Sequence, residues 1–275
     1  MNQDISNILD YIERSKSIHL NGYKSKFLIE LLDKRITDTG RKSYQSYLKY
    51  LQQNDEEPDK LIHALTIQHS EFFRNPVVYN YLSEKILPSI IQQKITLKEP
   101  TIRAWSAGCA HGEEAYSLSI LINEIAEKKK ADIVPRIFAT DIEKSALARA
   151  KEAIYHRDTI ENIPYGLVEK HFSKEENYFR IKENISRCVS FSLHDLLDKR
   201  TSVPPASVFG NFDLVFCRNV LIYFKSHFQE LICKKLYSSL ALDGFLILGE
   251  TESIPSNFGN HFISIADHHI FQKQG

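Results

Sequence analysis

Residues Thr101 to Tyr116, TIRAWSAGCAHGEEAY, combine a short apolar strand with a glycine turn and the start of a helix. The strand ends before Gly108, and the helix has begun by Glu113. A helix is predicted because apolar side chains recur at i, i+3, i+4 and i+7, namely at Leu118, Leu121, Ile122 and Ile125. A strand, a glycine turn and a helix N-terminus together bring backbone N–H groups close to a ligand. The stretch therefore predicts a ligand site.

Two carboxylates, Glu113 and Glu114, begin the predicted helix. Negative side chains repel phosphate, so they suit a cationic group such as an amino or sulfonium group better. No Gly-Lys-Ser/Thr follows the glycine turn, so this is not the phosphate-binding P-loop. The pattern favours a ligand that carries positive charge.

The composition is that of an ordinary soluble globular protein, with 43% hydrophobic and 25% charged residues and a formal net charge of zero. Its 275 residues are enough for one large domain or two ordinary ones. No apolar run approaches about 20 residues and no signal pattern begins the chain, so we expect neither a membrane span nor secretion. The cysteines are scattered without a Cys-x-x-Cys pair, which predicts reduced thiols in the cytoplasm: Cys109, Cys188, Cys217 and Cys233.

Neutral overall charge hides a basic segment between Arg14 and Lys49, where nine Lys or Arg residues face only three carboxylates. Two apolar stripes predict short helices here, the first at Phe27, Leu28, Leu31 and Leu32 and the second at Tyr44, Tyr47, Leu48 and Leu51. The cations are either a solvated face of a small helical domain or a docking surface for an acidic partner. On the second interpretation, reversing four of them should weaken docking without affecting folding: Lys34, Arg35, Arg41 and Lys42.

The stretch Ser70-Glu71-Phe72-Phe73-Arg74 follows a helix predicted over Leu61 to Ile67. Two adjacent Phe residues beside one Arg are consistent with a cation held near buried rings. A hydrophobic hinge with an exposed Arg is the alternative. A further helix is predicted over Val77 to Ile91, and it leads to the glycine stretch.

Three later strands are predicted at Arg136 to Asp141, Val189 to Phe191 and Asn211 to Phe224. The first ends in an acid, the second is followed by Asp195, and the third runs into polar residues that include Asn219. In an open α/β sheet, ligands sit at the carboxyl ends of the strands, and a carboxylate after the second strand holds ribose hydroxyls. Asp141, Asp195 and Asn219 should therefore share one rim with Gly108. An N-cap for the helix predicted at Ser145 to Ala153 is the alternative role for Asp141.

The remaining pattern predicts a small hairpin inserted at about residues 155–187, then a helix over Phe228 to Leu240 that stops at Asp243-Gly244. A strand follows at Phe245 to Gly249, and two weaker strands finish the chain near Phe262 to Ile265 and His269 to Phe271. We expect no metal at His268-His269, because adjacent strand residues point to opposite faces.

Taken together, these motifs resemble the chemotaxis protein methyltransferases, the CheR family. The resemblance covers nearly the whole chain and rests on Ser70 to Arg74, Trp105 to Cys109 with Gly112-Glu113-Glu114, Ala139-Thr140-Asp141 and Phe216 to Phe224. It implies an α/β fold: an all-helical N-terminal domain at 1–75, then a Rossmann-like class I methyltransferase sheet at 76–275 with an inserted β-subdomain.

The resemblance also implies a cofactor, S-adenosylmethionine, with S-adenosylhomocysteine as product. Ser70 and Arg74 would reach the cofactor and the methyl-transfer centre, and Tyr223 would face the acceptor. The other cofactor contacts would come from Gly108, one or both of Glu113 and Glu114, Asp141, Asp195, Leu196, Asn219 and Val220. Asp195 stands where the family often has Asn.

The implied reaction is methyl transfer to glutamate side chains of chemoreceptors, and the implied partner is the acidic cytoplasmic helical bundle of the receptor. We expect a monomer that neither binds nucleic acid nor inserts into a membrane. Two alternatives stay open: a cofactor-binding signalling module that has lost transfer, and a methyltransferase with a different acceptor. Exposed aromatics interleaved with extreme positive charge, which would favour nucleic acid, are not evident.

Overall fold

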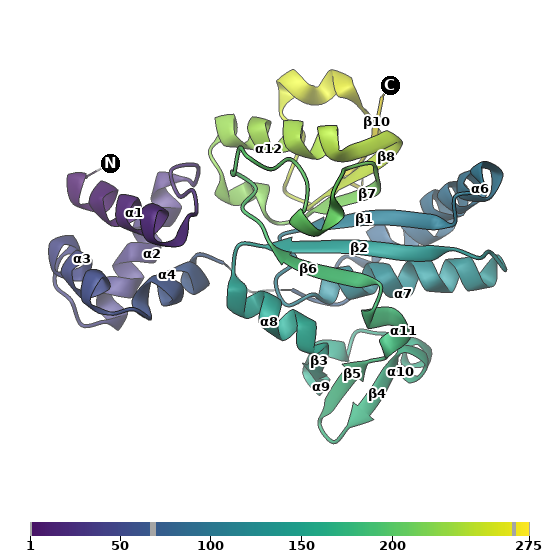
Figure 1. Ribbon diagram of the computed structural model, residues 1–275, viewed down its shortest axis with the longest axis horizontal. Coiled ribbons are helices and arrows are strands. Elements are labelled where there is room, and N and C mark those ends of the chain that lie inside the picture. The colour runs from purple at the N-terminus through teal and green to yellow at the C-terminus, as the bar shows by residue number, and fades with distance from the viewer. Residues whose placement is uncertain (1, 67–69, 266–267, 275) are drawn as a thin grey trace.

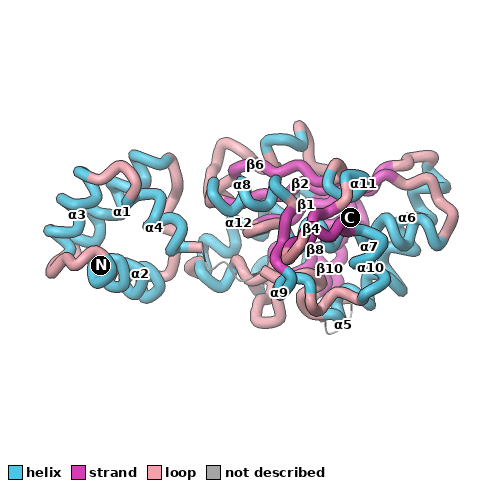
Figure 2. The backbone as a smooth tube through the Cα atoms, turned by 90° about the horizontal axis from the view of Figure 1, so that it is seen from below, coloured by secondary structure: helices cyan, strands magenta, loops and turns pink. Residues whose placement is uncertain are grey.

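The computed structural model describes residues 2–66, 70–265 and 268–274. Figure 1 shows a helical unit, which contains the N-terminus, joined by a linker to a larger domain built on a sheet. Figure 2 shows the same separation from a second direction. Within the described residues, no helix is long and apolar enough to cross a membrane.

The helical unit contains α1 (Gln3–Lys16), α2 (Ser25–Asp38), α3 (Tyr44–Gln53) and α4 (Glu57–Leu65). Both predicted apolar stripes face its core, where Leu32 and Tyr47 are fully buried. Phe27 and Leu48 lie at the edges of the stripes and are only partly buried. The helices are thus held mainly by packing of their apolar faces.

A buried ion pair also holds the helical unit together, and it corrects one expectation. The Arg35 guanidinium donates to both carboxylate oxygens of Glu57 at 2.8 Å, and the Tyr47 hydroxyl donates to the same carboxylate at 2.8 Å. The side chains of Arg35 and Glu57 are only 14% and 1% exposed. Reversing Arg35 would place two carboxylates together in the core, so the prediction that its reversal spares folding is wrong.

The large sheet has the strand order β6-β2-β1-β7-β8-β10-β9. Its first five strands pair in parallel, and the last two are antiparallel. The strands are β1 (Thr101–Ala107), β2 (Val134–Asp141), β6 (Val189–Leu193), β7 (Phe212–Cys217), β8 (Leu240–Leu248), β9 (Phe262–Ser264) and β10 (Ile270–Lys273). The chain order reverses at β1, between β2 and β7, and ligands of open α/β sheets bind at such a switch point.

Helices cover both faces of this sheet. Figure 1 shows α12 (Ser226–Ser239) above it and α7 (Glu113–Lys128) and α8 (Lys144–Glu152) below it. The helix predicted at Val77 to Ile91 runs from α5 (Pro76–Tyr81) through a π-helical turn (Leu82–Ile86) into α6 (Leu87–Leu97). Pro88 lacks the N–H that an α-helical ladder needs, and a π-helical turn before it accommodates that break.

Two predicted boundaries are wrong. The strand predicted at Asn211 to Phe224 ends at Cys217, and a 3₁₀ turn runs from Leu221 to Tyr223. Helix α12 ends at Ser239, and β8 runs from Leu240 through Asp243-Gly244, which we expected to stop the helix. The pairing of β7 with β8 shifts register between Phe212 and Leu214, opposite this point. A Cβ on Gly244 would lie 2.8 Å from the Phe212 carbonyl oxygen, so Asp-Gly here makes an irregularity within the strand.

The inserted segment forms a second, three-stranded sheet that projects below the large one in Figure 1. The predicted hairpin is β4 (Phe172–Glu175) with β5 (Tyr178–Ile181), and β3 (Ile154–His156) adds a strand beside β5. Three short helices flank it: α9 (Arg157–Ile160), α10 (Tyr165–His171) and α11 (Glu183–Ser186). The domain limits at 75 and 155–187 stay predictions.

Candidate functional site

A cavity of about 290 Å³ opens at the carboxyl ends of the parallel strands, between the sheet domain and the helical unit. Every predicted site residue except Glu113 lines it, although these residues are spread over more than 150 positions of sequence. They are Ser70, Arg74, Gly108, Glu114, Asp141, Asp195, Leu196, Asn219, Val220 and Tyr223. The rim that strand order predicts therefore exists, while the role of each residue stays a prediction.

The glycine turn brings the end of β1 close to the segment that follows β7. Gly108 and Gly112 have φ values of +81° and +93°, in the left-handed region that favours glycine. The N–H groups of Gly108 and Cys109 both donate to the Thr140 carbonyl, at 2.8 and 3.0 Å. A Cβ on Gly108 would lie 2.4 Å from Val220 Cγ2, so a larger residue would push these two walls of the cavity apart.

Asp141 ends β2 and ties the glycine turn to the next helix. One carboxylate oxygen accepts the N–H of Ala110 at 2.9 Å, and the other accepts the N–H of Glu143 at 3.0 Å. Burial raises the pKa of Asp141, and these N–H groups oppose the rise. The N-cap position of α8 belongs to Glu143, so the simple N-cap alternative for Asp141 is wrong. Each oxygen can accept a further hydrogen bond, which leaves Asp141 able to hold a diol from the cavity.

The two helix-opening carboxylates have different surroundings. Glu114 lines the cavity, accepts the Ser106 hydroxyl at 2.6 Å and lies 3.7 Å from the Arg218 guanidinium. Burial raises the pKa of Glu114, and the positive charge of Arg218 opposes the rise. Glu113 is 3% exposed and does not line the cavity. The geometry therefore favours Glu114 as the partner of a cationic ligand group.

Glu113 is a buried carboxyl beside the linker between the two domains. Burial raises the pKa of Glu113 to about 7, and hydrogen bonds from its own backbone N–H and from Ser70 oppose that rise. Its Oε2 atom has no hydrogen-bond partner among the described residues. Glu113 is thus a group that holds a proton more tightly than an ordinary glutamate.

The linker turns sharply before it reaches α5. Phe72 is 2% exposed, and its ring packs edge-on against Tyr155 at a centroid distance of 4.8 Å. Phe73 and Asn75 have positive φ values of 52° and 63°. The Phe73 N–H donates to Ser117 Oγ at 2.9 Å, which ties the linker to α7. These contacts bury Phe72 while Arg74 lines the cavity.

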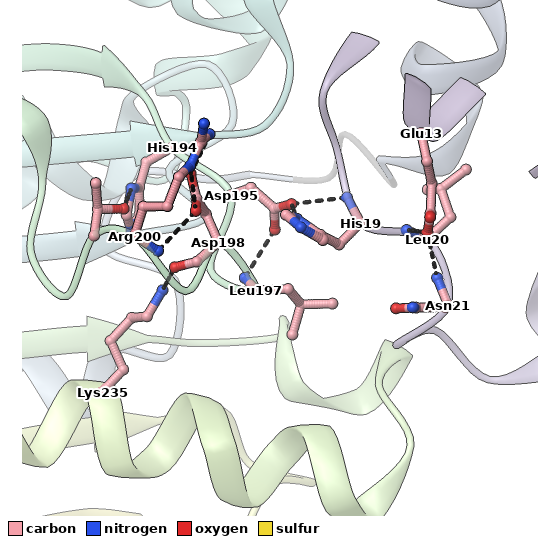
Figure 3. Close-up of polar contacts among 11 residues, drawn as sticks. Glu13, His19, Leu20, Asn21, His194, Asp195, Leu197, Asp198, Arg200 and Lys235 are labelled. Atoms are coloured by element: carbon pink, nitrogen blue, oxygen red, sulfur yellow. Dashed lines mark hydrogen bonds and ion pairs between the residues drawn. The ribbon is translucent and has the colours of Figure 1, made fainter. Parts of the chain in front are cut away.

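Sequence reasoning missed the contribution of the helical unit, which supplies one wall of the cavity. Asp195 Oδ2 accepts a hydrogen bond from the backbone N–H of His19 at 2.8 Å and lies 2.7 Å from the Nδ1 atom of the His19 ring. Figure 3 shows these two side chains pointing toward each other, with Leu197 donating to the other oxygen of Asp195. His19 lies 176 positions before Asp195. No local sequence signal could have paired them.

A second contact joins the same two parts beside Tyr223. The Lys24 N–H donates to the Tyr223 carbonyl at 2.8 Å, and the Lys225 N–H donates to the Gly22 carbonyl at 2.9 Å. The Phe27 ring lies 5.0 Å from that of Tyr223, measured between centroids. Tyr23, which lines the cavity, was also missed by sequence reasoning. The segment after β7 is therefore held from the helical unit as well as from the sheet.

The cavity suits S-adenosylmethionine by the chemistry of its lining. Asp141 can accept a ribose diol, and Glu114 offers negative charge to an amino or sulfonium group. Gly108, in the glycine turn, lines the cavity together with these two carboxylates and has no side chain to fill it. Among the residues of ranges 2–66, 70–265 and 268–274, no group of three His, Cys, Asp or Glu could hold a metal ion.

Comparisons with known proteins agree with this site. The family model described as "CheR methyltransferase, SAM binding domain" matches residues 68–270, and "CheR methyltransferase, all-alpha domain" matches residues 3–66. The chain is 30% identical over 263 residues to "Chemotaxis protein methyltransferase" of Borreliella burgdorferi, covering 94% of this chain and 91% of that one. It is 31% identical over 255 residues to "Chemotaxis protein methyltransferase 2" of Vibrio cholerae, covering 91% and 85%.

A longer "Uncharacterized 104.1 kDa protein" of Rhodobacter capsulatus is 28% identical over 268 residues, covering 98% of this chain and 27% of that one. The family model for the cofactor-binding domain spans most of the chain, and the helical model accounts for most of the remainder. Both matches agree with the architecture, a helical unit followed by a sheet domain. The chain belongs to the CheR family and is an S-adenosylmethionine-dependent chemotaxis methyltransferase.

Proposed function

We propose that this protein methylates glutamate side chains on the cytoplasmic helical domain of a chemoreceptor. A glutamate oxygen forms a bond to the methyl carbon, the carbon–sulfur bond breaks, and its electron pair stays on sulfur. The products are a glutamate methyl ester and S-adenosylhomocysteine. The observation that carries the proposal is that Arg74 and Tyr223 line the same cavity as Asp141 and Glu114.

This chemistry asks the protein for orientation more than for acid–base catalysis. Bound S-adenosylmethionine supplies an activated methyl group on a sulfonium. A glutamate acceptor is already ionised at pH 7, so no general base is needed. We propose that Arg74 orients the acceptor carboxylate through a charge-assisted pair and that Tyr223 faces it. Burial raises the pKa of Tyr223, and the Arg74 guanidinium opposes that rise, which agrees with the two side chains lying near one another.

The roles proposed for the cofactor-binding residues are those that the CheR resemblance implies, and these residues all line the cavity. Asp141 binds the ribose diol, and Glu114 holds the amino group of the methionine part. Asp195 and Leu196 lie along the adenine, while Asn219 and Val220 line the remaining wall. Ser70 and Gly108 complete the site at the linker and the glycine turn.

The proposed receptor contact uses the exposed cations of the helical unit. Lys34, Arg41 and Lys42 are exposed, whereas Arg35 is committed to its buried partner. An acidic receptor bundle would be steered toward these cations, although each exposed ion pair is worth only about 0–1 kcal/mol. We further propose that the protein acts as a monomer.

The test is methylation of a purified receptor cytoplasmic fragment with S-adenosylmethionine tritiated in the methyl group. A glutamate ester releases volatile radioactive methanol in mild alkali, whereas methyl groups on nitrogen stay bound. We expect alkali-labile label on the fragment. Label should fall when the receptor's methylated glutamates are replaced by alanine, and it should fall with the Arg74→Ala enzyme.

Three results would favour the other acceptor classes or a module without transfer. Alkali-stable label on the fragment would indicate a different acceptor group. Label on added RNA or on small molecules, with none on the fragment, would indicate a different substrate class. Binding of S-adenosylmethionine without any transfer would indicate a signalling module.

A further inference from the structure

Glu252 is a buried carboxylate that collects an unusual number of backbone donors. It follows β8 and is 4% exposed. Its Oε2 accepts the N–H groups of Gly249 at 2.7 Å and Asn219 at 2.8 Å. Its Oε1 accepts those of Val220 at 2.7 Å and Ile222 at 3.3 Å. Three of these four donors belong to one short segment, which follows β7.

That segment has no regular ladder to satisfy its backbone. Asn219 has a φ of +59°, Val220 has a φ of −117°, and a single 3₁₀ turn runs from Leu221 to Tyr223. Buried N–H groups without acceptors are costly, so an irregular segment of this kind needs an external acceptor. A carboxylate serves especially well, because its charge strengthens each hydrogen bond.

The surroundings of Glu252 are fitted to this contact. A Cβ on Gly249 would lie 2.7 Å from Glu252 Oε2 and 2.8 Å from the Asn219 nitrogen, so glycine is needed for the close approach. The backbone carbonyl of Glu252 is itself bonded by His269 Nδ1 at 2.8 Å. Both ends of the residue are therefore fixed, and the carboxylate cannot easily follow a displaced segment.

Glu252 acts on the cavity only through other residues. Asn219, Val220 and Tyr223 line the cavity, whereas Glu252 is not among its lining residues. We propose that Glu252 is a positioning residue for methyl transfer, which sets the backbone from Asn219 to Tyr223. Through that backbone it places Asn219 and Val220 for the cofactor and Tyr223 for the acceptor. The Tyr223 part rests on the proposed function, and the cofactor part does not.

The primary variant is Glu252→Gln, which keeps the shape but turns an NH₂ group toward at least one backbone N–H. The matched control is Asp213→Asn. Asp213 is also buried and accepts a backbone N–H, from Arg103 at 2.8 Å, but it lies at the other end of β7. Both variants should lower the melting temperature. Only Glu252→Gln should weaken S-adenosylhomocysteine binding, by at least fivefold in calorimetry, and lower kcat at saturating substrates, by at least tenfold.

A double-mutant cycle with Tyr223→Phe separates positioning from general damage. If Glu252 acts through Tyr223, Glu252→Gln should reduce kcat much less in the Tyr223→Phe background than in the wild type. Additive losses in kcat would overturn the Tyr223 part. Equal losses of S-adenosylhomocysteine affinity in Glu252→Gln and Asp213→Asn would overturn the cofactor part.

Two further measurements keep the inference testable if Glu252→Gln does not fold or the receptor is not the acceptor. Calorimetry with S-adenosylhomocysteine requires no acceptor, so it is independent of the proposed function. The Glu252→Asp variant keeps the charge on a shorter side chain. Faster amide hydrogen exchange at Val220 and Ile222 in that variant, together with weaker S-adenosylhomocysteine binding, would support the inference. Unchanged exchange and affinity would overturn it.

Discussion

Replacing Asp141 with asparagine should weaken cofactor binding, and the structure sets the size of the effect. The carboxylate lines the cavity at the end of β2 and already accepts two backbone N–H groups. The amide has one acceptor oxygen in place of two. Its NH₂ group must therefore face either a backbone N–H or the ribose hydroxyls.

The expected loss comes from hydrogen bonds to a charged, buried acceptor. Such bonds contribute about 1.5–3 kcal/mol each. Because about 1.4 kcal/mol is a tenfold change in Kd, losing one ribose bond corresponds to roughly a 10- to 150-fold weaker complex. Asp141→Asn should also lower stability, since the N–H of Ala110 or Glu143 loses its acceptor. Alanine would remove the acceptors of both the Ala110 and the Glu143 N–H groups, so asparagine perturbs the fold less and is the better test of cofactor binding.

The assay is calorimetric titration with S-adenosylhomocysteine and with an analogue that lacks both ribose hydroxyls. Wild-type protein should bind the analogue much more weakly. Asp141→Asn should discriminate between the two compounds less strongly than the wild type, because one of the hydrogen bonds that distinguish them is lost. Asp213→Asn, with its carboxylate at the far end of the sheet, should distinguish the two ligands as the wild type does.

Two results would refute this reasoning. If Asp141→Asn bound S-adenosylhomocysteine as tightly as the wild type, Asp141 would not hold the ribose. If the variant still discriminated against the analogue as strongly as the wild type, the diol would be recognised by other residues.

The other predictions concern transfer, docking and pH. Arg74→Ala should lower turnover at least about tenfold, or ~1.4 kcal/mol in barrier, and should weaken cofactor binding less; steady-state kinetics with calorimetry checks both. Reversing Lys34 and Lys42 to Glu should raise the KM for receptor fragment without lowering the melting temperature, whereas Arg41 is kept because its guanidinium lies 4.4 Å from the centroid of the Tyr50 ring. Added salt should lower wild-type turnover at sub-saturating fragment. In the folded protein the pKa of Glu113 is about 7, above its ordinary value of 4.5, so the folded state holds this proton more tightly than the unfolded state does. The resulting contribution to the free energy of unfolding is fully present below pH 4.5 and is lost as pH rises through 7. In the wild type, this proton release should lower the free energy of unfolding by roughly 3 kcal/mol as pH rises from 4.5 to 7. Glu113→Gln cannot release the proton, so its melting temperature should change less between pH 5 and 8 than that of the wild type.

Several features of this protein were predictable because they are local. The glycine turn and the start of α7 at Glu113 follow from residue type and spacing, and so do most strands of the sheet. Strand order in a doubly wound fold then predicts that Gly108, Asp141 and Asn219 share one rim, and all three line one cavity.

Local sequence patterns predicted the fold class and placed Gly108, Asp141, Asp195 and Asn219 on one rim, because turn chemistry and hydrophobic period act over a few residues. The family resemblance, and not periodicity, added Ser70, Arg74, Leu196, Val220 and Tyr223. Only the tertiary structure decided which of two adjacent carboxylates, Glu113 or Glu114, lines the cavity. It also paired Arg35 with Glu57, and His19 with Asp195 across 176 positions. These contacts depend on how separate elements pack in space, and side-chain packing between distant segments leaves no periodic signal in the chain.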